Sequence, residues 1–341
     1  MLTSLQIDSF RGLKDLSFEP LSRINVITGF NNSGKTTVLE AIYLLLVQGK
    51  QIENYPNVFR SAQGSQMERF EHFWKWLLPN GDLNTEASVR SNDSEKRRLR
   101  VMVKQHQQQR GSLSVQHMDS SRGTTTFNVS KVGFGGMQER PWPRMEFFSP
   151  RMSDPVVDAE QYNKVQLLRD GEEIVLDLMR VVEPSLRKLR YAKITNEPLV
   201  YADVGLGTLL PASQMGQAFC RMLTLYMEML VTEAKVLLVD EIENGLHHSV
   251  FESVWKGIGA LAESHDIQVF VTTHSEECVS AAAKAAPQGA HHGFSRHRLE
   301  MFEKHIVVNT SSEVLGRTIP KKIGKIMKNT RSPTPSPPTR P

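Results

Sequence analysis

Hydrophobic positions near the start of the chain follow strand spacing first and helical spacing afterwards. Residues 2–7 alternate between apolar and polar side chains, and residues 23–28 carry a denser set of apolar side chains. Both segments are therefore expected strands, the second more deeply buried. A glycine-rich turn follows, and the apolar residues of 37–46 recur at helical spacing. This order predicts a strand–loop–helix unit.

Between residues 85 and 149 the hydrophobic period changes to two. Short alternating segments are separated there by polar or glycine-containing connectors, and these segments are 87–90, 99–104, 113–116, 124–129 and 145–148. A succession of this kind is typical of an antiparallel meander.

Helices and fully apolar strands alternate in the later part of the chain. The expected helices cover 172–182, 217–231 and 250–263, and the expected strands cover 236–240 and 268–272. Strands that are buried on both faces and separated by helices imply a parallel sheet. The predicted fold class is α/β, with a mixed or parallel sheet, an antiparallel β-meander subdomain and a helical lobe.

The composition is that of a globular protein. Of its 341 residues, 39% are hydrophobic and 23% are charged, so a large core can form without disulfide or metal support. The two cysteines, Cys220 and Cys278, are too few for a disulfide framework and fit a reducing cytoplasm. The apolar run at 41–47 is too short to cross a bilayer, and no signal-peptide pattern precedes it. We therefore expect a cytoplasmic protein without membrane insertion.

The positive net charge belongs to one end of the chain. The formal charge is +4, but residues 320–341 hold six basic residues and no acidic ones, which leaves the rest near −2. Five prolines within 331–341 indicate a disordered tail. The overall charge is therefore no argument that the folded part binds nucleic acid. Two roles are open for the basic run 96–100: it contacts DNA phosphates, or it is a solvated run of charges.

The turn after the second strand carries the first chemical motif. Residues 29–36 read Gly-Phe-Asn-Asn-Ser-Gly-Lys-Thr, which matches the phosphate-loop pattern G-x-x-x-x-G-K-[ST] at every fixed position. Main-chain N–H groups and the start of the following helix surround phosphates in such a loop. Lys35 is expected at the β- and γ-phosphates, and the Thr36 hydroxyl on Mg²⁺. The candidate nucleotide-binding residues are Gly29, Asn31, Asn32, Ser33, Gly34, Lys35, Thr36 and Thr37.

Two adjacent carboxylates follow the apolar strand 236–239. Ligands of open α/β sheets bind at the carboxyl ends of the strands, beside a phosphate loop. Asp240 is the expected Mg²⁺ ligand, directly or through water, and Glu241 is expected to orient and polarise the attacking water.

A histidine ends the neighbouring apolar strand. His274 follows residues 268–273 and is expected to reach the γ-phosphate and report its presence. Histidine suits such a switch because its two ring nitrogens differ and it titrates near neutral pH. The histidine pairs 247–248 and 291–292 lack partners at zinc spacing, so metal binding is not expected there.

These segments together resemble the ABC-type ATPases of the soluble SMC/RecF/OLD-like branch. The resemblance rests on residues 7–12, 24–42, 238–247 and 268–275, and it extends over about residues 1–280. It implies a P-loop NTPase fold, ATP and Mg²⁺ as cofactors, and ATP hydrolysis. It also implies one head with a phosphate-loop lobe, antiparallel strands, a helical signature lobe, and Walker B and switch strands. These parts are expected at 1–50, 85–149, 150–231 and 232–280 within a head of 1–319, before a tail of 320–341.

The resemblance also implies that a second subunit completes each ATP site. The best match to the family's signature is 211–221, in which Ser213 and Gly216 correspond to its serine and first glycine. Ala218 stands where the second glycine is usual, and an ordinary helix start capped by Ser213 is the alternative. Two copies would sandwich two ATP molecules, giving a homodimer or higher homo-oligomer. The lid glutamine has only one weak candidate, Gln161.

The biological role is the least determined part of the resemblance. No heptad run indicates coiled-coil arms, and no acidic cluster typical of a TOPRIM nuclease follows residue 275. This favours a stand-alone head that controls a separate effector protein or a nucleic acid, in anti-phage defence or DNA maintenance. The alternatives are the ATP-binding subunit of a transporter and a nucleotide-dependent scaffold with little turnover.

Overall fold

The computed structural model describes residues 1–311 except 48, 61–64, 107–111, 136–144, 149–153, 195, 286–292 and 304. The expected disordered tail and the histidine pair 291–292 lie outside these described residues. Among the described residues, no helix is both long and apolar enough to cross a membrane.

The central element is a six-stranded sheet whose strands run parallel, except for the antiparallel β15–β16 hairpin at one edge. In sheet order its strands are β16 (His305–Ser311), β15 (Phe294–Phe302), β3 (Ile24–Gly29), β14 (Gln268–Thr273), β13 (Val236–Val239) and β9 (Met145–Phe148). Alternate residues of β13 and β14 enter two separate apolar cores. This double burial explains why both strands read as continuous apolar runs.

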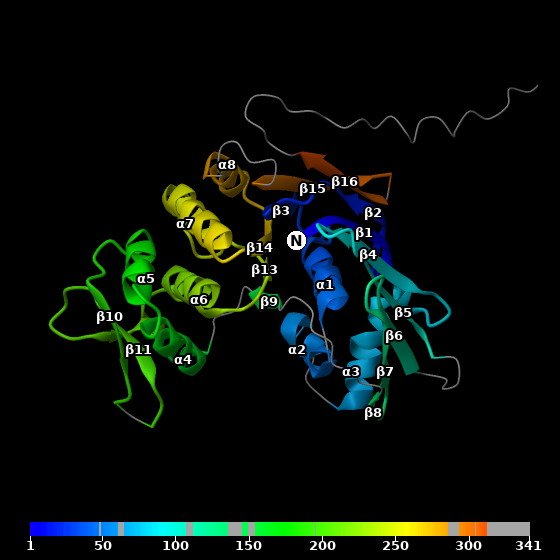
Figure 1. The fold of residues 1–341 in the computed structure, drawn as a ribbon, viewed down its shortest axis with the longest axis horizontal. Coiled ribbons are helices and arrows are strands. Elements are labelled where there is room, and N and C mark those ends of the chain that lie inside the picture. The colour runs from blue at the N-terminus through cyan, green and yellow to red at the C-terminus, as the bar shows by residue number, and fades with distance from the viewer. Residues whose placement is uncertain are drawn as a thin grey trace, which may run out of the picture.

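A second, antiparallel sheet of seven strands packs on the other side of helix α1 (Figure 1). In sheet order its strands are β2 (Leu13–Phe18), β1 (Leu2–Phe10), β4 (Ala87–Asp93), β5 (Arg98–Gln105), β6 (Ser112–Asp119), β7 (Gly123–Ser130) and β8 (Gly133–Gly135). The inner face of this sheet and α1 (Lys35–Leu46) form the first core, together with α2 (Tyr55–Arg60) and α3 (Gln66–His72).

The remaining helices cover the opposite face of the parallel sheet and form the second core (Figure 1). They are α4 (Pro155–Gln166), α5 (Gly171–Arg180), α6 (Gln217–Val231), α7 (Phe251–Ser264) and α8 (Glu276–Ala285). A small antiparallel sheet extends this helical region, and its strands are β10 (Lys188–Ala192), β11 (Leu199–Asp203) and β12 (Leu210–Pro211).

The structure confirms the α/β class and corrects one strand assignment. The segment 145–148 was predicted within the antiparallel meander, but as β9 it pairs in parallel with β13, Met145 opposite Val236. The main-chain N–H of Asp240 extends this pairing by donating to the carbonyl of Phe148, at 2.9 Å. Short alternating segments do not reveal their partner strand, so alternation alone led to the wrong sheet. β8 pairs with β7 at the end of the meander where β9 was expected, and β1 extends the opposite end by pairing with β4.

Candidate functional site

The phosphate-loop motif connects β3 to α1, as the sequence predicts. Gly34 is the residue before α1 and has a φ of 89°, a left-handed conformation that favours glycine. A Cβ at Gly34 would lie 2.7 Å from Leu13 Cδ2, and one at Gly29 would lie 2.7 Å from the carbonyl oxygen of Leu299. The loop is therefore seated between β2 and β15, and both glycines are needed sterically.

The first turn of α1 supplies main-chain donors at the end of this loop. Lys35, Thr36 and Thr37 occupy that turn, where N–H groups have no intrahelical carbonyl to bind. Asn31 and Asn32 are exposed at the tip of the loop. The Oγ atom of the buried Ser33 has no hydrogen-bond partner among the described residues. Unpaired donors around a glycine loop fit a bound phosphate chain.

Lys35 lies over the loop that precedes it. Its Nζ donates to the carbonyl oxygens of Gly29 and Phe30, both at 3.0 Å. Burial lowers the pKa of the Lys35 ammonium, and the carboxylates that follow β13, Glu243 foremost, oppose that shift. The ammonium is thus held between the loop and an acidic edge.

Asp240 and Thr36 meet at this edge, although they are far apart in the sequence. The Thr36 Oγ1 hydroxyl lies 3.1 Å from Oδ1 and 3.0 Å from Oδ2 of Asp240. The Thr272 hydroxyl also donates to Asp240 Oδ1, at 2.5 Å. Carboxylate and hydroxyl oxygens are hard ligands that suit Mg²⁺, which usually takes one or two carboxylates and completes its shell with water and phosphate oxygens. The residues present therefore fit this ion.

The turn that carries Glu241 is held from two sides. Glu241 has a left-handed φ of 51°, and its N–H donates to Thr272 Oγ1 at 2.8 Å. Arg221, from helix α6, donates through Nη2 to the carbonyl oxygens of Asp240 and Glu241, at 3.1 and 3.0 Å. Burial lowers the pKa of Arg221, and Glu241 is the carboxylate that opposes this most. Arg221 ends the signature segment, but no role for it was predicted from the sequence.

His274 lies at the end of β14, on the same edge of the sheet. Its main-chain N–H donates to Glu243 Oε1 at 2.8 Å, and its ring Nδ1 lies 2.8 Å from the same oxygen. Its side chain is half exposed, whereas Glu243 is buried. Sequence reasoning included Glu243 in a motif without assigning it a function.

An open pocket of about 620 Å³ adjoins the loop and His274. Its lining residues are Thr28, Gly29, Phe30, Asn31, His274, Ser275, Glu276, Val279 and Arg298. Arg298 comes from β15, a strand for which the sequence analysis gave no prediction. The structure thus brings the loop, the acidic pair and His274 together at one sheet edge, while their catalytic roles stay predictions.

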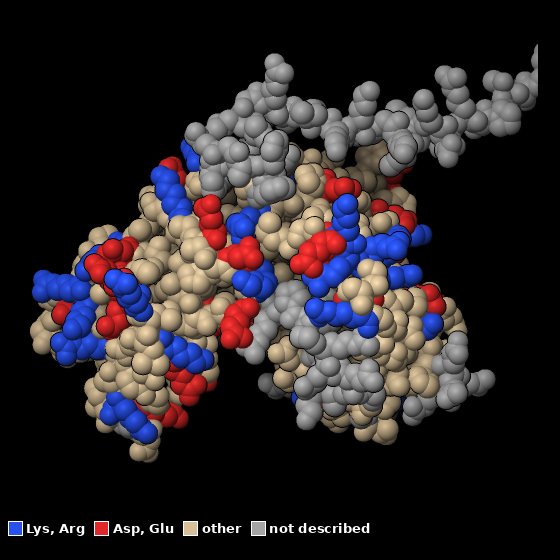
Figure 2. Space-filling view, viewed as in Figure 1, with Lys and Arg blue, Asp and Glu red and all other residues tan. Residues whose placement is uncertain are grey.

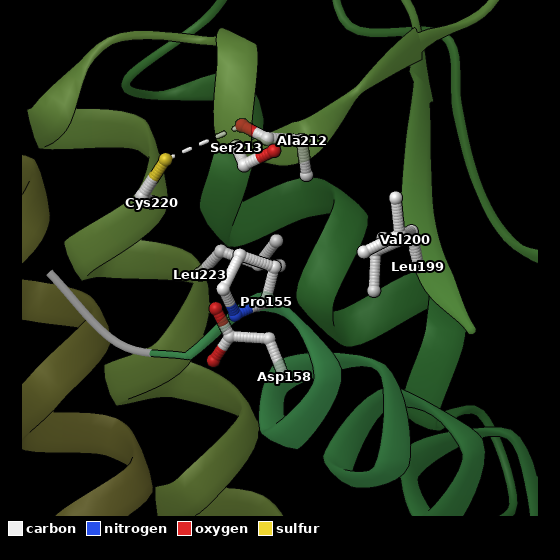
Figure 3. A pocket seen from close by; sticks show the side chains of 8 residues that line it. All are labelled: Pro155, Asp158, Leu199, Val200, Ala212, Ser213, Cys220 and Leu223. Carbon is white, nitrogen blue, oxygen red and sulfur yellow. Dashed lines mark hydrogen bonds between the residues drawn. The ribbon is translucent and has the colours of Figure 1, made fainter. Parts of the chain in front are cut away.

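The signature segment lies elsewhere in the chain's own structure. Ser213 belongs to a single 3₁₀ turn and lines a small pocket beside Ala212 and Cys220 (Figure 3). Gly216, not Ser213, is the residue before α6, and no side chain caps this helix. A Cβ at the exposed Gly216 would meet no atom within 4 Å. Among the described residues, no hydrogen bond or ion pair joins Ser213 or Gly216 to the phosphate loop.

Two weaker candidates lie outside this edge. Gln161 Nε2 donates to Glu228 Oε2 at 2.9 Å, which places this glutamine between α4 and α6. In the basic run 96–100, Arg97 pairs with Asp93 at 2.6 Å, and Arg100 donates to a serine hydroxyl. Basic side chains over β1 and β4 are interspersed with acidic ones (Figure 2). DNA binding by this run stays a prediction.

The glycine loop lies against β15, and the Asp240 carboxylate follows a strand that is two places away from β3 in the sheet. A separate helical lobe covers the opposite face of this sheet. The fold and motifs are those of an AAA-type ATPase domain, and they resemble the ABC-type ATPases of the branch that contains SMC and RecF proteins. A family model described as "AAA domain, putative AbiEii toxin, Type IV TA system" matches residues 68–280, more than half of the chain, and the chain belongs to this family. A model described as "AAA ATPase domain" matches residues 1–114, which include the phosphate loop.

Individual proteins show the same relationship. An "ATP/GTP phosphatase" of Helicobacter pylori is 22% identical over 325 residues, which cover 82% of this chain and 86% of the relative. The "DNA replication and repair protein RecF" of a Shewanella species is 37% identical over 81 residues, but this match covers 24% of this chain and 22% of RecF.

Solved structures support the fold assignment. An SMC head bound to the C-winged helix domain of ScpA aligns with a TM-score of 0.58 and 12% identity, over 91% of this chain and 97% of that one. A Pyrococcus furiosus SMC head with an extended coiled coil, bound to the C-terminal domain of ScpA, aligns with a TM-score of 0.51 and 12% identity, over 92% and 96%. At this identity the likeness establishes the fold.

Proposed function

We propose that this chain binds ATP with Mg²⁺ and hydrolyses it at the edge formed by the phosphate loop and the carboxylates after β13. The contact between Thr36 and Asp240 carries this proposal, because it joins the motif for phosphate binding to the motif for metal binding. Mg²⁺ would be held by these two residues and would neutralise charge on the phosphates. Lys35 would bind the β- and γ-phosphates, and Glu241 would orient the attacking water.

Phosphate release by the purified chain tests this activity. The wild type is expected to release phosphate from ATP in the presence of Mg²⁺, and EDTA is expected to stop the release. Glu241→Gln is expected to lower turnover at least about 100-fold while nucleotide binding persists. Glu252→Gln, on the exposed surface of α7, is the matched control. Release that is equal in Glu241→Gln and wild type would contradict the role of Glu241.

We further infer that ATP draws two copies together, each supplying Ser213 and Gly216 to the other's loop. The open surroundings of Gly216 and the absence of a described contact from Ser213 to its own loop support this arrangement. Glu241→Gln with ATP should sediment as a stable dimer, because slow hydrolysis keeps ATP in place. A monomer under these conditions would rule out the sandwich.

The dimerisation cycle is proposed to control a separate effector protein or a nucleic acid in the bacterial cytoplasm. The family description, which names a toxin of a toxin–antitoxin system, supports a defence role, and two free, buried cysteines fit a reducing compartment. Cells expressing the chain with its neighbouring genes should resist phage infection, and cells expressing Lys35→Ala should not. Equal plaque counts in the two strains would exclude an ATP-dependent defence role.

A further inference from the structure

Glu243 joins two loops of the candidate site. It lies in the turn after β13, whereas its partner His274 lies at the end of β14. Glu243 Oε1 accepts the main-chain N–H of His274 at 2.8 Å and also faces the ring Nδ1 at 2.8 Å. One buried carboxylate oxygen therefore fixes both the backbone and the ring of the histidine.

This contact determines which ring nitrogen of His274 is available to a ligand. An ionised carboxylate only accepts hydrogen bonds, so the Nδ1 atom that faces it must carry a hydrogen. Nε2 is then the free nitrogen of a ring that lines the open pocket beside Gly29 and Asn31. Such a second group sets the tautomer of many functional histidines.

The carboxylate of Glu243 belongs to the site and not to the outer surface. Only 8% of the residue is exposed, and its Oε2 atom has no hydrogen-bond partner among the described residues. Glu243 is also the carboxylate that most strongly opposes the lowering of the Lys35 pKa, ahead of Asp240 and Glu241. A buried, partly unpaired carboxylate is costly for folding, which favours a role in the chemistry of the site.

We propose that Glu243 is a positioning residue, which accepts the Nδ1–H of His274 and turns the opposite ring nitrogen, Nε2, toward the terminal phosphate of ATP. Nε2 donates to a phosphate oxygen after taking a proton from the solvent, so the ring carries both hydrogens when ATP is bound. This inference rests on the proposed ATPase function. Glu243 is expected to act mainly through the ring of His274, so most of its contribution to turnover should disappear when the imidazole is absent.

A double-mutant cycle on turnover tests this dependence. Glu243→Ala and His274→Ala are each expected to lower kcat about tenfold with little change in the KM for ATP. In the His274→Ala background, Glu243→Ala should cause a further loss of less than about threefold. Glu243→Gln keeps an acceptor and should stay within about threefold of wild type. If the losses in kcat multiply, Glu243 acts independently and the inference is wrong.

Nitrogen NMR of the nucleotide-free protein tests the tautomer without any turnover. Long-range ¹⁵N–¹H correlations of His274 should show the Nδ1–H form in wild type and lose it in Glu243→Ala. A wild-type ring in the Nε2–H form would overturn the inference, even if the protein hydrolyses ATP. A protein that shows Nδ1–H but releases no phosphate would instead contradict the proposed function.

Discussion

The region around Lys35 and the region around Ser213 differ in how many contacts to the other groups of the candidate site each makes within the same chain. Lys35 has bonds to its own loop, carboxylates nearby, and a neighbour, Thr36, that contacts Asp240. Ser213 and Gly216 stand at the start of α6 with no described bond to any of these groups. The first region holds most of the groups that the proposed phosphate and metal site needs, and the second is proposed to be one half of a contact between two copies.

Helix α6 connects the two regions. Arg221 ties the first turns of α6 to the carbonyl oxygens after Asp240 and Glu241. A Cβ at Gly245 would lie 3.1 Å from the main-chain nitrogen of Ala218, so the same turn also packs against the start of α6. In the proposed sandwich, a partner that contacts Ser213 would therefore lie next to the helix that holds the turn of Glu241.

The largest expected effect comes from removing the positive charge of Lys35 in the first region. Lys35→Ala should lower kcat/KM for ATP hydrolysis about 100- to 1000-fold, because it removes the charge that binds the β- and γ-phosphates. Phosphate release and titration with a fluorescent ATP analogue measure this loss.

The matched control for that variant is Lys256→Ala. Lys256 is exposed on α7, and its one ion pair among the described residues is with Glu252, one helical turn away, at 2.8 Å. Its removal should leave hydrolysis unchanged. Equal hydrolysis by Lys35→Ala and Lys256→Ala would show that the loop does not bind the reacting phosphates.

A smaller effect is expected from a change at Ser213 in the second region, and it concerns turnover and not ATP binding. Ser213→Arg should leave ATP binding by the monomer unchanged and lower turnover about tenfold, because it blocks the contact with a second copy. Isothermal titration with ATP and phosphate release separate the two quantities. Weakened ATP binding with unchanged turnover would show that Ser213 serves ATP binding within its own chain and not a contact with a second copy.

The smallest expected effect concerns the strand that carries the loop. His297 on β15 is fully buried opposite Ile27 of β3, and burial lowers its pKa from 6.5 to about 3. Below pH 6.5 only the unfolded chain gains this proton, so the free energy of unfolding should fall as the pH drops. The expected loss is about 0.7 kcal/mol from pH 7 to pH 6, approaching about 1.4 kcal/mol per unit below that.

Chemical denaturation at several pH values measures this slope. His297→Gln should lack the part of the slope that belongs to this histidine, and the difference between the two proteins isolates it from the carboxylates. Parallel pH profiles for the two proteins would show that His297 is equally protonated in the folded and unfolded chains.

The phosphate loop and its flanking elements were predictable because their signals are local. The glycines, Lys35 and Thr36 lie within eight residues, between a buried strand and an amphipathic helix. Helix α6 was also predicted with its observed bounds, since its apolar spacing is strong and it ends before a polar connector. These features depend on backbone conformation and spacing, which a sequence states directly.

The parts that were missed depend on pairing across the chain. β1 pairs with β4, and β9 pairs in the parallel sheet and not in the meander. The alternation of apolar and polar residues in these strands does not indicate which strand each one pairs with. Glu243 contacts His274, and Arg221 contacts the carbonyl oxygen of Asp240, only because the fold brings β13, β14 and α6 together. Their residue types were visible in the sequence, but their contacts follow from tertiary structure.

The most direct test mixes two variants, each of which is impaired in a different one of the two regions. Lys35→Ala retains an intact signature segment, and Ser213→Arg retains an intact phosphate loop, so a mixed dimer contains one complete site. An equal mixture should recover about a quarter of wild-type phosphate release, because half of the randomly assorted dimers are mixed and each has one working site of two. Release no greater than the sum of the two separate proteins would contradict a site shared between two copies.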